Sequence, residues 1–189
     1  MRIFYDTEFV ERGPQLPIQL ISLGMVREDG QELYLINEEC LSNVARHPWL
    51  SVNVFPWLPA KGAVNDILEW DREHPDYPNV FAFDMLAPRV REFLDVDKPE
   101  LWAYYGAYDH VVLCQLFGAM VDLPPGVPMY TRDLMQEWDR LDSKPPMPGQ
   151  SHEHHALFDA RWARDFWQVL YTYNEVTQAI EQVPQEEKE

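Results

Sequence analysis

At Arg2–Glu8 the chain reads RIFYDTE, and its other segments are best understood from this stretch. The isoleucine, phenylalanine and tyrosine favour a β-strand, and a strand sends alternate side chains to opposite faces. Asp6 and Glu8 are therefore predicted to share one face at the end of a buried strand. Two carboxylates so placed repel each other, and each titrates abnormally unless a cation lies between them. The pair could also point into solvent, so its meaning depends on what other segments bring to it.

The composition indicates one globular domain with a marked acidic charge. The 189 residues are 46% hydrophobic and include seven Trp, nine Tyr and nine Phe, which is enough for a packed core. The net charge of −17 argues against avid, non-specific binding of nucleic acid through its phosphates. It does not exclude an enzyme that neutralises phosphate with metal ions. We predict a single domain over residues 1–180 and an acidic, disordered tail at 181–189.

Two cysteines bear on the compartment. Cys40 and Cys114 lie far apart in the sequence, and neither belongs to a metal-binding C-x-x-C pair. There is no signal peptide and no apolar run of about 18 residues. Since disulfides are rare in reducing compartments, this pattern predicts a cytoplasmic protein that does not enter the membrane.

Three segments near the start of the chain predict an antiparallel meander. Residues 18–26 form a second apolar run, and an Asp-Gly turn signal separates it from a third strand at residues 32–36. A compact strand is predicted at residues 101–104, and a short fifth one at 128–131. The fold class is therefore predicted as α/β, with a mixed five-stranded sheet whose first three strands are antiparallel.

Helical spacing of apolar residues predicts helices on both faces of this sheet. They are expected at residues 62–72, 85–94 and 108–118, through 134–141, and at 155–176. Asp109 heads the apolar stripe of the helix at 108–118, and Asp159 heads the stripe of the last helix. Because an unpaired carboxylate on a core-facing stripe is costly, both acids need a partner.

Three separate segments thus deliver four inward-facing carboxylates: Asp6, Glu8, Asp109 and Asp159. Four acids in one buried place would repel each other prohibitively without cations. Oxygen ligands without cysteine favour Mg²⁺ or Mn²⁺ over Zn²⁺. Two such ions roughly 4 Å apart can stabilise the attacking and leaving oxygens of a phosphoryl displacement. The pattern therefore predicts a metal-dependent hydrolytic site.

His154, five residues before Asp159, is the candidate general base. The ordinary pKa of imidazole lies near the working pH, so a neutral histidine can take a proton from the attacking water. His152 and His155 lie beside it. Three histidines in four positions could also form a surface cluster or a transition-metal site.

These residues carry a resemblance to a known family. Asp6-Thr7-Glu8, Tyr108-Asp109 and His154-x-Ala156-x-x-Asp159-Ala160 resemble the three motifs of the DEDDh 3′→5′ exonucleases. These enzymes have the ribonuclease H-like fold and include ribonuclease T, oligoribonuclease and proofreading subunits. The resemblance implies that the four acids hold two Mg²⁺ ions, which Mn²⁺ could replace. It also implies that His154 is the general base and that Glu8 takes part in catalysis.

Within that family the chain is most similar to the adenylate-preferring bacterial exoribonuclease AS. This finer resemblance rests on the length, on the insertion around residues 40–80 and on Asp6-Thr7-Glu8-Phe9. It implies release of nucleoside 5′-monophosphates from single-stranded, adenylate-rich 3′ ends of RNA. It also implies a homodimer like that of ribonuclease T. Candidate dimer surfaces are residues 49–59 and the long terminal helix.

Two positions depart from the family pattern. Many members carry Asn four residues before the middle Asp, where this chain has Tyr105. Many also have Thr-Gly shortly after the first Glu, whereas Phe9-Val10-Glu11 follows here. In relatives the residue after that Glu packs against the terminal sugar and base. Phe9 is therefore a candidate for substrate binding, with a core phenylalanine at a strand end as the alternative.

The same residues are compatible with other functions. A DNA 3′→5′ exonuclease of the proofreading type needs the same acids, because recognition of the 2′-hydroxyl depends on pocket contacts. A catalytically silent nucleic-acid-binding domain and a metal-binding protein without nuclease activity are alternatives of another class. Basic residues that could contact phosphates are Arg12, Arg132, Lys144, Arg161 and Arg164.

Overall fold

A computed structural model describes residues 1–62 and 68–181 of the chain. At its centre is a six-stranded mixed sheet with the strand order β6-β3-β2-β1-β7-β8. The pairs β1·β2 and β2·β3 are antiparallel, and β7, β8 and β6 each pair with a neighbour in parallel. The strands are β1 (Arg2–Val10), β2 (Gln19–Arg27), β3 (Glu32–Asn37), β6 (Val80–Phe81), β7 (Glu100–Ala103) and β8 (Arg132–Asp133).

The predicted α/β class and the antiparallel meander are confirmed, but the strand count of five is wrong. The described residues contain a sixth strand in this sheet, β6, which pairs with β3 at Ile36↔Val80 and Asn37↔Phe81. A two-residue strand is too short to show the alternating pattern from which strands are predicted. The predicted strand at 128–131 also starts later, as β8 at Arg132.

Six α-helices occur in the described part of the chain. They are α1 (Leu41–Arg46), α2 (Leu50–Asn53), α3 (Leu86–Leu94), α4 (Ala107–Gln115), α5 (Leu134–Asp139) and α6 (Ala156–Glu181). Short 3₁₀ turns are η1 (Phe55–Trp57), η2 (Tyr77–Asn79), η3 (Phe83–Met85) and η4 (Met120–Asp122). The long terminal helix therefore runs further than the predicted end at residue 176. Residues 182–189, on which most of the predicted tail falls, lie outside the described residues.

The helix predicted at residues 62–72 is wrong in its described part. Residues 63–67 lie outside the described residues, and Glu69–Trp70 forms a strand, β5, that pairs antiparallel with β4 (Ala60–Lys61). Lys61 pairs with Glu69 in this ladder and contacts Asp71 at 2.7 Å. A short helix is only marginally stable in water, so these cross-strand contacts prevail over local helical spacing.

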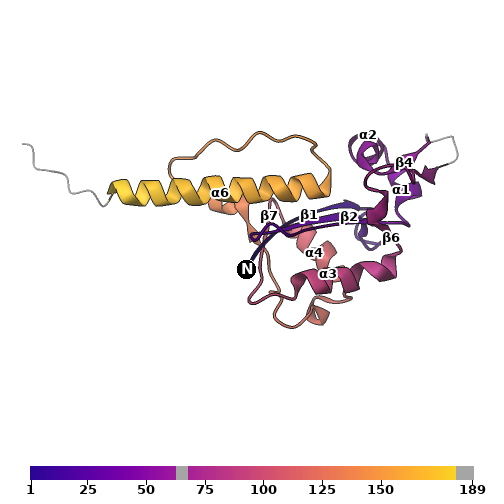
Figure 1. Ribbon diagram of the computed structural model, residues 1–189, viewed down its shortest axis with the longest axis horizontal. Helices are drawn as coiled ribbons and strands as arrows, with labels where there is room; N and C mark the ends of the chain where they lie inside the picture. Colours follow the sequence, from indigo (N-terminus) through magenta and orange to yellow (C-terminus); the bar gives the residue numbers. More distant parts are fainter. Residues whose placement is uncertain (63–67, 182–189) are drawn as a thin grey trace, which may run out of the picture.

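The sheet separates two layers of helices (Figure 1). Helix α6 runs along one face, and α3 and α4 lie along the other. Phe4 packs with Phe166 of α6, whereas Ile3 and Tyr5 pack with Leu86 of α3 and other residues on the opposite side. Alternation along β1 therefore directs Asp6 and Glu8 to the face that α6 covers, and Thr7 to the other.

Gly24 lets the start of α6 lie directly on the sheet. It pairs with Asp6 in the β1·β2 ladder. A Cβ atom at this position would fall 2.3 Å from the carbonyl oxygen of Ala156 and 2.4 Å from Cα of Leu157. Only glycine accommodates so close a backbone, and the first turn of α6 is thereby placed beside Asp6.

The helices and the two cysteines bear on the predicted environment of the protein. Within residues 1–62 and 68–181, none of the helices combines the length and the apolar character that a membrane crossing needs. Cys40 and Cys114 are buried free thiols.

Candidate active site

Asp6, Glu8 and Asp159 form one acidic group. Each offers a carboxylate oxygen, and these three atoms all lie within 4.8 Å of one another. Asp6 and Glu8 come from alternate positions of β1, and Asp159 comes from the first turn of α6. Oδ2 of Asp6 is closed to solvent and has no hydrogen-bond partner among the described residues. A buried carboxylate oxygen without a donor is costly, and a cation would relieve that cost.

Asp159 is held by two donors from the segment before α6. The side-chain amide of Gln150 donates to Oδ1 at 2.7 Å, and the backbone N–H of His154 donates to Oδ2 at 2.8 Å. The sequence analysis did not identify Gln150, because nothing in the proline-rich segment around it marks one amide as a partner of a distant acid.

Asp109 lies beside this group and is not one of its three members. It belongs to α4, on the other face of the sheet, and its Oδ1 accepts hydrogen bonds from the backbone N–H and the hydroxyl of Thr7 at 2.8 and 2.7 Å. The negative charge of Asp109 still raises the pKa of Asp6. Thr7, between the two predicted acids, is therefore a site residue that the sequence analysis missed. Support for Asp109 thus comes from Thr7, within β1.

Burial and mutual repulsion set the electrostatics of the site. Burial raises the pKa of Asp109 to about 6, although the two hydrogen bonds from Thr7 oppose the rise. Burial also raises the pKa of Asp159 to about 6, with the nearby charge of Glu8 adding to it. The pKa of Asp6 lies well above its ordinary value, first because of burial and then because of Asp109 and Glu8. The set of acids is therefore poorly stabilised as anions without a cation.

His154 lies at the rim of the acidic group. Its Nδ1 is 3.7 Å from Oε1 of Glu8, and the Glu8 carboxylate raises the pKa of the imidazole. The residue adopts φ of 69°, a left-handed conformation that is uncommon for a non-glycine residue. That turn directs the backbone N–H of His154 to Asp159 and its side chain to Glu8.

The three neighbouring histidines do not form a common site. His155 is buried, stacks on Tyr34 with ring centroids 4.6 Å apart, and has Nε2 3.7 Å from Asp76. His152 stacks on Phe158 at 4.5 Å. Among the described residues, the acidic group is the set suited to holding a metal ion, and it contains no histidine. The alternative of a transition-metal histidine cluster therefore has no support in the described residues.

Phe9 follows a β-bulge that shifts the β1·β2 register after Glu8. Its ring stacks on Tyr108, with centroids 5.8 Å apart and planes 8° from parallel. Phe9 is partly buried against the core on the α3 and α4 side. The structure therefore joins Phe9 to an exposed tyrosine next to Asp109, and its contact with substrate stays a prediction.

The acidic group opens into a cleft of about 250 Å³. The walls come from β1, the residue after β7, the segment before α6 and the first two turns of α6. The lining residues are Tyr5, Asp6, Glu8, Tyr104, Gln150, Glu153, His154, Asp159, Trp162 and Ala163.

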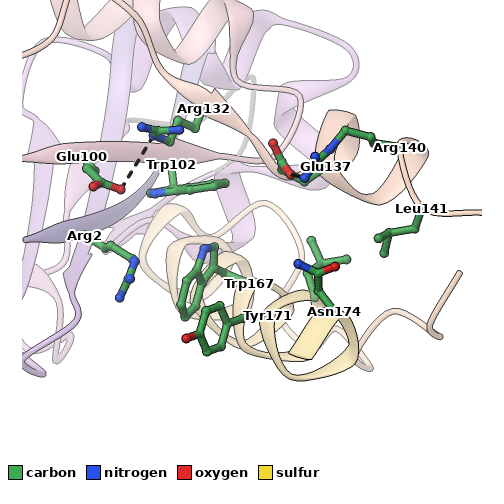
Figure 2. Close-up of a pocket in the computed structure, with 11 residues that line it drawn as sticks. Arg2, Glu100, Trp102, Arg132, Glu137, Arg140, Leu141, Trp167, Tyr171 and Asn174 are labelled. Atoms are coloured by element: carbon green, nitrogen blue, oxygen red, sulfur yellow. Dashed lines mark hydrogen bonds and ion pairs between the residues drawn. The ribbon is translucent and has the colours of Figure 1, made fainter. Parts of the chain in front are cut away.

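Most of the basic residues considered for phosphate contacts have acidic partners. Arg161 pairs with Glu32, Arg164 with Asp165, and Lys144 with Asp139. Arg132 lines a separate hollow of about 260 Å³, where it faces Glu100 at 3.7 Å (Figure 2).

The same hollow is lined by two further arginines. The guanidinium of Arg2 lies 4.3 Å from the ring centre of Trp167, and Arg140 pairs with Glu137 (Figure 2). These arginines already have acidic or aromatic partners, so the hollow does not present free cations.

Comparison with known proteins places the chain in a family. A family model described as the 3′-5′ exoribonuclease Rv2179c-like domain matches residues 1–171. The chain belongs to this family. The predicted enzyme class, a 3′-5′ exoribonuclease, is thereby confirmed. Two curated relatives agree: 3′-5′ exoribonuclease Rv2179c of Mycobacterium tuberculosis strain H37Rv and 3′-5′ exoribonuclease MT2234.1 of strain CDC 1551. Each is 43% identical over 166 residues, or 85% of this chain and 88% of the relative.

Solved structures of exonuclease I share the fold. One structure of exonuclease I matches 90% of this chain with a TM-score of 0.60 and 14% identity. The zinc-bound form of E. coli exonuclease I with single-stranded DNA matches 92% of this chain with a TM-score of 0.60 and 13% identity. The chain spans about two fifths of the length of these proteins, 40% and 41%. At this identity the likeness concerns the fold alone, and it agrees with the predicted ribonuclease H-like fold.

Proposed function

We propose that this exoribonuclease removes nucleoside 5′-monophosphates from single-stranded 3′ ends of RNA with two Mg²⁺ ions, which Mn²⁺ can replace. The observation that carries the proposal is the acidic group with the unpartnered Oδ2 of Asp6. Asp6, Glu8 and Asp159 would hold the ions, and Asp109 would complete the set from the other side of β1. Ions held there would supply positive charge for the scissile phosphate and the departing 3′-oxygen.

In this proposal His154 is the general base, and Glu8 contributes to catalysis as well as to metal binding. The Glu8 carboxylate, 3.7 Å from Nδ1, orients the imidazole and stabilises its protonated form. The imidazole takes the proton of the attacking water. Because the backbone of His154 also donates to Asp159, the base and an acid of the metal site are positioned by one turn of chain.

A preference for adenylate-rich 3′ ends, as in exoribonuclease AS, is the finer part of the proposal. It rests on the resemblance of the motifs and on the aromatic pair Phe9 and Tyr108 beside Asp109. Stacked aromatic side chains hold unpaired bases in single-stranded RNA. Phe9 is accordingly proposed to contact the terminal nucleotide.

The experiment that tests the function offers 5′-labelled homopolymeric RNA and DNA of equal length with Mg²⁺ and resolves the products on a gel. We expect a ladder that shortens from the 3′ end, fastest on oligoadenylate RNA and absent with EDTA. His154→Ala should slow turnover by roughly 100-fold or more while Mg²⁺ binding is retained. Equal rates on DNA would favour the proofreading-type alternative, and shortening that persists in EDTA would contradict the metal-dependent mechanism.

A homodimer is proposed through α6. The carboxyl-terminal half of this helix extends beyond the sheet (Figure 1), with Tyr171 and Val176 exposed. A groove along the same helix is lined by Pro145, Pro148, Val169 and Val176. Apolar helix faces of this kind are buried in subunit interfaces. Sedimentation equilibrium of the wild type and of Val176→Asp tests the proposal, which a monomeric wild type would contradict.

A reducing, cytoplasmic compartment stays a prediction, with which two buried free thiols are compatible.

A further inference from the structure

Trp49 is an exposed indole at the rim of the candidate active site. It immediately precedes α2 and remains 48% exposed. Its ring meets that of His154 edge to face, with centroids 4.7 Å apart and planes at 78°. Since Nδ1 of His154 is 3.7 Å from Oε1 of Glu8, one imidazole ring separates the indole from the acidic group. A large exposed apolar side chain next to a catalytic cleft calls for an explanation.

The backbone around Trp49 is fixed to the element that carries the third motif. Leu50, the next residue, is buried in a cluster that also contains Val54, Leu58 and Ala156, the first residue of α6. The carbonyl oxygen of Trp49 accepts a hydrogen bond from the side chain of Asn53 at 2.9 Å. Trp49 is therefore held at a set position relative to the start of α6.

The histidine segment makes further contacts with the insertion that contains Trp49. Trp57 lies 5.1 Å from His152 between ring centroids, and Asp76 lies 3.7 Å from Nε2 of His155. Figure 1 shows α1, α2 and β4 beside the amino-terminal end of α6. The described parts of the insertion, residues 40–62 and 68–80, thus pack against the start of α6, and Trp49 is an exposed residue there that contacts His154.

We propose that Trp49 is the stacking platform for the 3′-terminal nucleobase and that it favours a purine there. The inference rests on the proposed function, which places the scissile phosphate at the acidic group. In a nucleotide one sugar ring separates the base from its phosphate. In this structure one imidazole ring, that of His154, separates the Trp49 indole from Glu8, so the two separations correspond. Exposed aromatic faces bind unpaired bases by stacking, and the two-ring indole overlaps a two-ring purine more than a pyrimidine.

Phe9 differs from Trp49 in its surroundings. Phe9 keeps its proposed contact with the terminal nucleotide, but its ring is partly buried and already stacked on Tyr108, so the exposed stacking surface is left to Trp49. By contrast, Trp49 keeps about half of its surface exposed to solvent. The alternative role for Trp49 is to hold the His154 ring in place, which would make it a positioning residue without substrate contact. The two roles separate kinetically, since lost stacking raises KM and a misplaced base lowers kcat.

The test compares Trp49→Ala, Trp49→Phe and a control variant in the full-length enzyme with Mg²⁺. The control is Val52→Ala, because Val52 lies in α2 only three residues after Trp49 and is 70% exposed. KM and kcat are measured on 5′-labelled single-stranded RNA ending in adenylates or in uridylates. For adenylate ends we expect Trp49→Ala to raise KM about 5- to 150-fold, the factor that corresponds to loss of one base–aromatic stack.

In the same assay kcat should stay within about twofold, Trp49→Phe should recover part of the affinity, and Val52→Ala should match the wild type. The rise in KM should be smaller for uridylate ends. A fall in kcat at unchanged KM would overturn the proposal in favour of a positioning role. Equal losses on both substrates would overturn the purine preference, and unchanged kinetics in Trp49→Ala would overturn the platform altogether.

A binding measurement keeps this test separate from that of the proposed function. Fluorescence polarisation of 5′-labelled oligoadenylate with Ca²⁺ in place of Mg²⁺ reports affinity without turnover. Weaker binding by Trp49→Ala than by Val52→Ala supports the platform, and equal binding overturns it. Failure of the proposed function would instead show as absence of Mg²⁺-dependent 3′ shortening in the wild type.

Discussion

At the scale of single residues, the unpartnered Oδ2 of Asp6 is the most informative atom of the molecule. It is closed to solvent, it lies among like charges, and the pKa of its carboxyl is raised well above the ordinary value. A group of this kind destabilises the metal-free fold, and a bound cation would relieve that cost. Stability and function are therefore expected to oppose each other at this position.

Asp6→Asn tests that opposition. The amide removes one negative charge and keeps the size of the side chain, so we expect the metal-free protein to melt a few degrees higher, because a relieved repulsion is worth on the order of 1 kcal/mol. Mg²⁺ should raise the melting temperature of the wild type and not that of the variant, and 3′ shortening should be lost. The measurement is thermal unfolding in EDTA and in Mg²⁺. A variant that melts lower in EDTA, or that responds to Mg²⁺ like the wild type, would contradict this account.

Thr7 is the other residue whose role depends on one acid. Its hydroxyl and its backbone N–H both donate to Oδ1 of Asp109. Thr7→Val keeps the branched shape and removes the hydroxyl donor, so we expect a loss of about 1.5–3 kcal/mol in the free energy of unfolding, as for hydrogen bonds to charged groups. We also expect kcat to fall about 10-fold or more, because Asp109 loses its orientation.

Thr7→Ser is the matched control for that substitution, since it retains the hydroxyl. Chemical denaturation and single-turnover kinetics at neutral pH give the two quantities. The interpretation fails if the serine and valine variants behave alike.

At the scale of elements, the strand β1 and the helix α6 position the acids by different means. Alternation along β1 presents Asp6 and Glu8 to one face and Thr7 to the other, which is how a single strand serves both α6 and α4. The position of α6 depends on Gly24, on which its first turn lies. The close approach of backbone to backbone is what brings Asp159 within reach of Asp6.

Gly24→Ala should disturb this approach. The added methyl group would fall 2.3 Å from the carbonyl oxygen of Ala156, so the start of α6 has to move. We expect a loss of about 1–3 kcal/mol in the free energy of unfolding, as for other overpacked interiors, together with reduced activity. Gly149→Ala is the control, because a Cβ there meets nothing within 4 Å. Denaturant unfolding and the exonuclease assay check both effects, and normal activity in Gly24→Ala would show that α6 need not lie so close.

At the scale of the whole molecule, carboxylates approach β1 from both faces of the sheet. They do so in the middle of the strand and not at the predicted strand end, because β1 continues to Val10. Asp159 comes from α6 on one face and Asp109 from α4 on the other. The chain carries a net charge of −17, so no general excess of cations neutralises them. Their titration is consequently linked to the stability of the fold.

The direction of that linkage follows from the raised pKa values. Asp109 and Asp159 have pKa values of about 6 in the folded protein, above the ordinary value of about 3.9. Between these values the folded state binds more protons than the unfolded state, so the free energy of unfolding falls as the pH rises. The stability that these two groups contribute is fully present below about pH 4 and is lost as the pH passes through about 6.

Urea denaturation of the metal-free protein between pH 5 and pH 8 measures this effect. We expect stability to fall with pH in EDTA and the fall to be smaller in Mg²⁺, since a cation favours the charged carboxylates. Asp159→Asn should flatten the dependence in EDTA. A stability that rises across this range in all three samples would contradict the assignment of raised pKa values.

The helix that was wrongly predicted at residues 62–72 and the strand β6, which was not predicted, show where sequence patterns fail. Two-residue strands such as β5 and β6 depend on pairing with another strand. They are too short to show the alternation of polar and apolar residues from which strands are predicted. Gln150 and Thr7 were missed for a related reason. A single amide or hydroxyl becomes part of a site only through the acid that it reaches, 9 residues away for Gln150 and 102 for Thr7.

Local patterns along the chain predicted the main strands, the sharing of one face by Asp6 and Glu8, the acids that head two helices, and the enzyme class that the motifs resemble. These features depend on local periodicity and on residue chemistry, both of which can be read along the chain. How these acids are arranged follows from the fold: Asp159 lies with Asp6 and Glu8, Asp109 is held by Thr7 from the opposite face, and Trp49 lies against His154. These contacts depend on how closely α6 approaches the sheet and on where the insertion packs, and distances between remote segments are set by packing of the whole core.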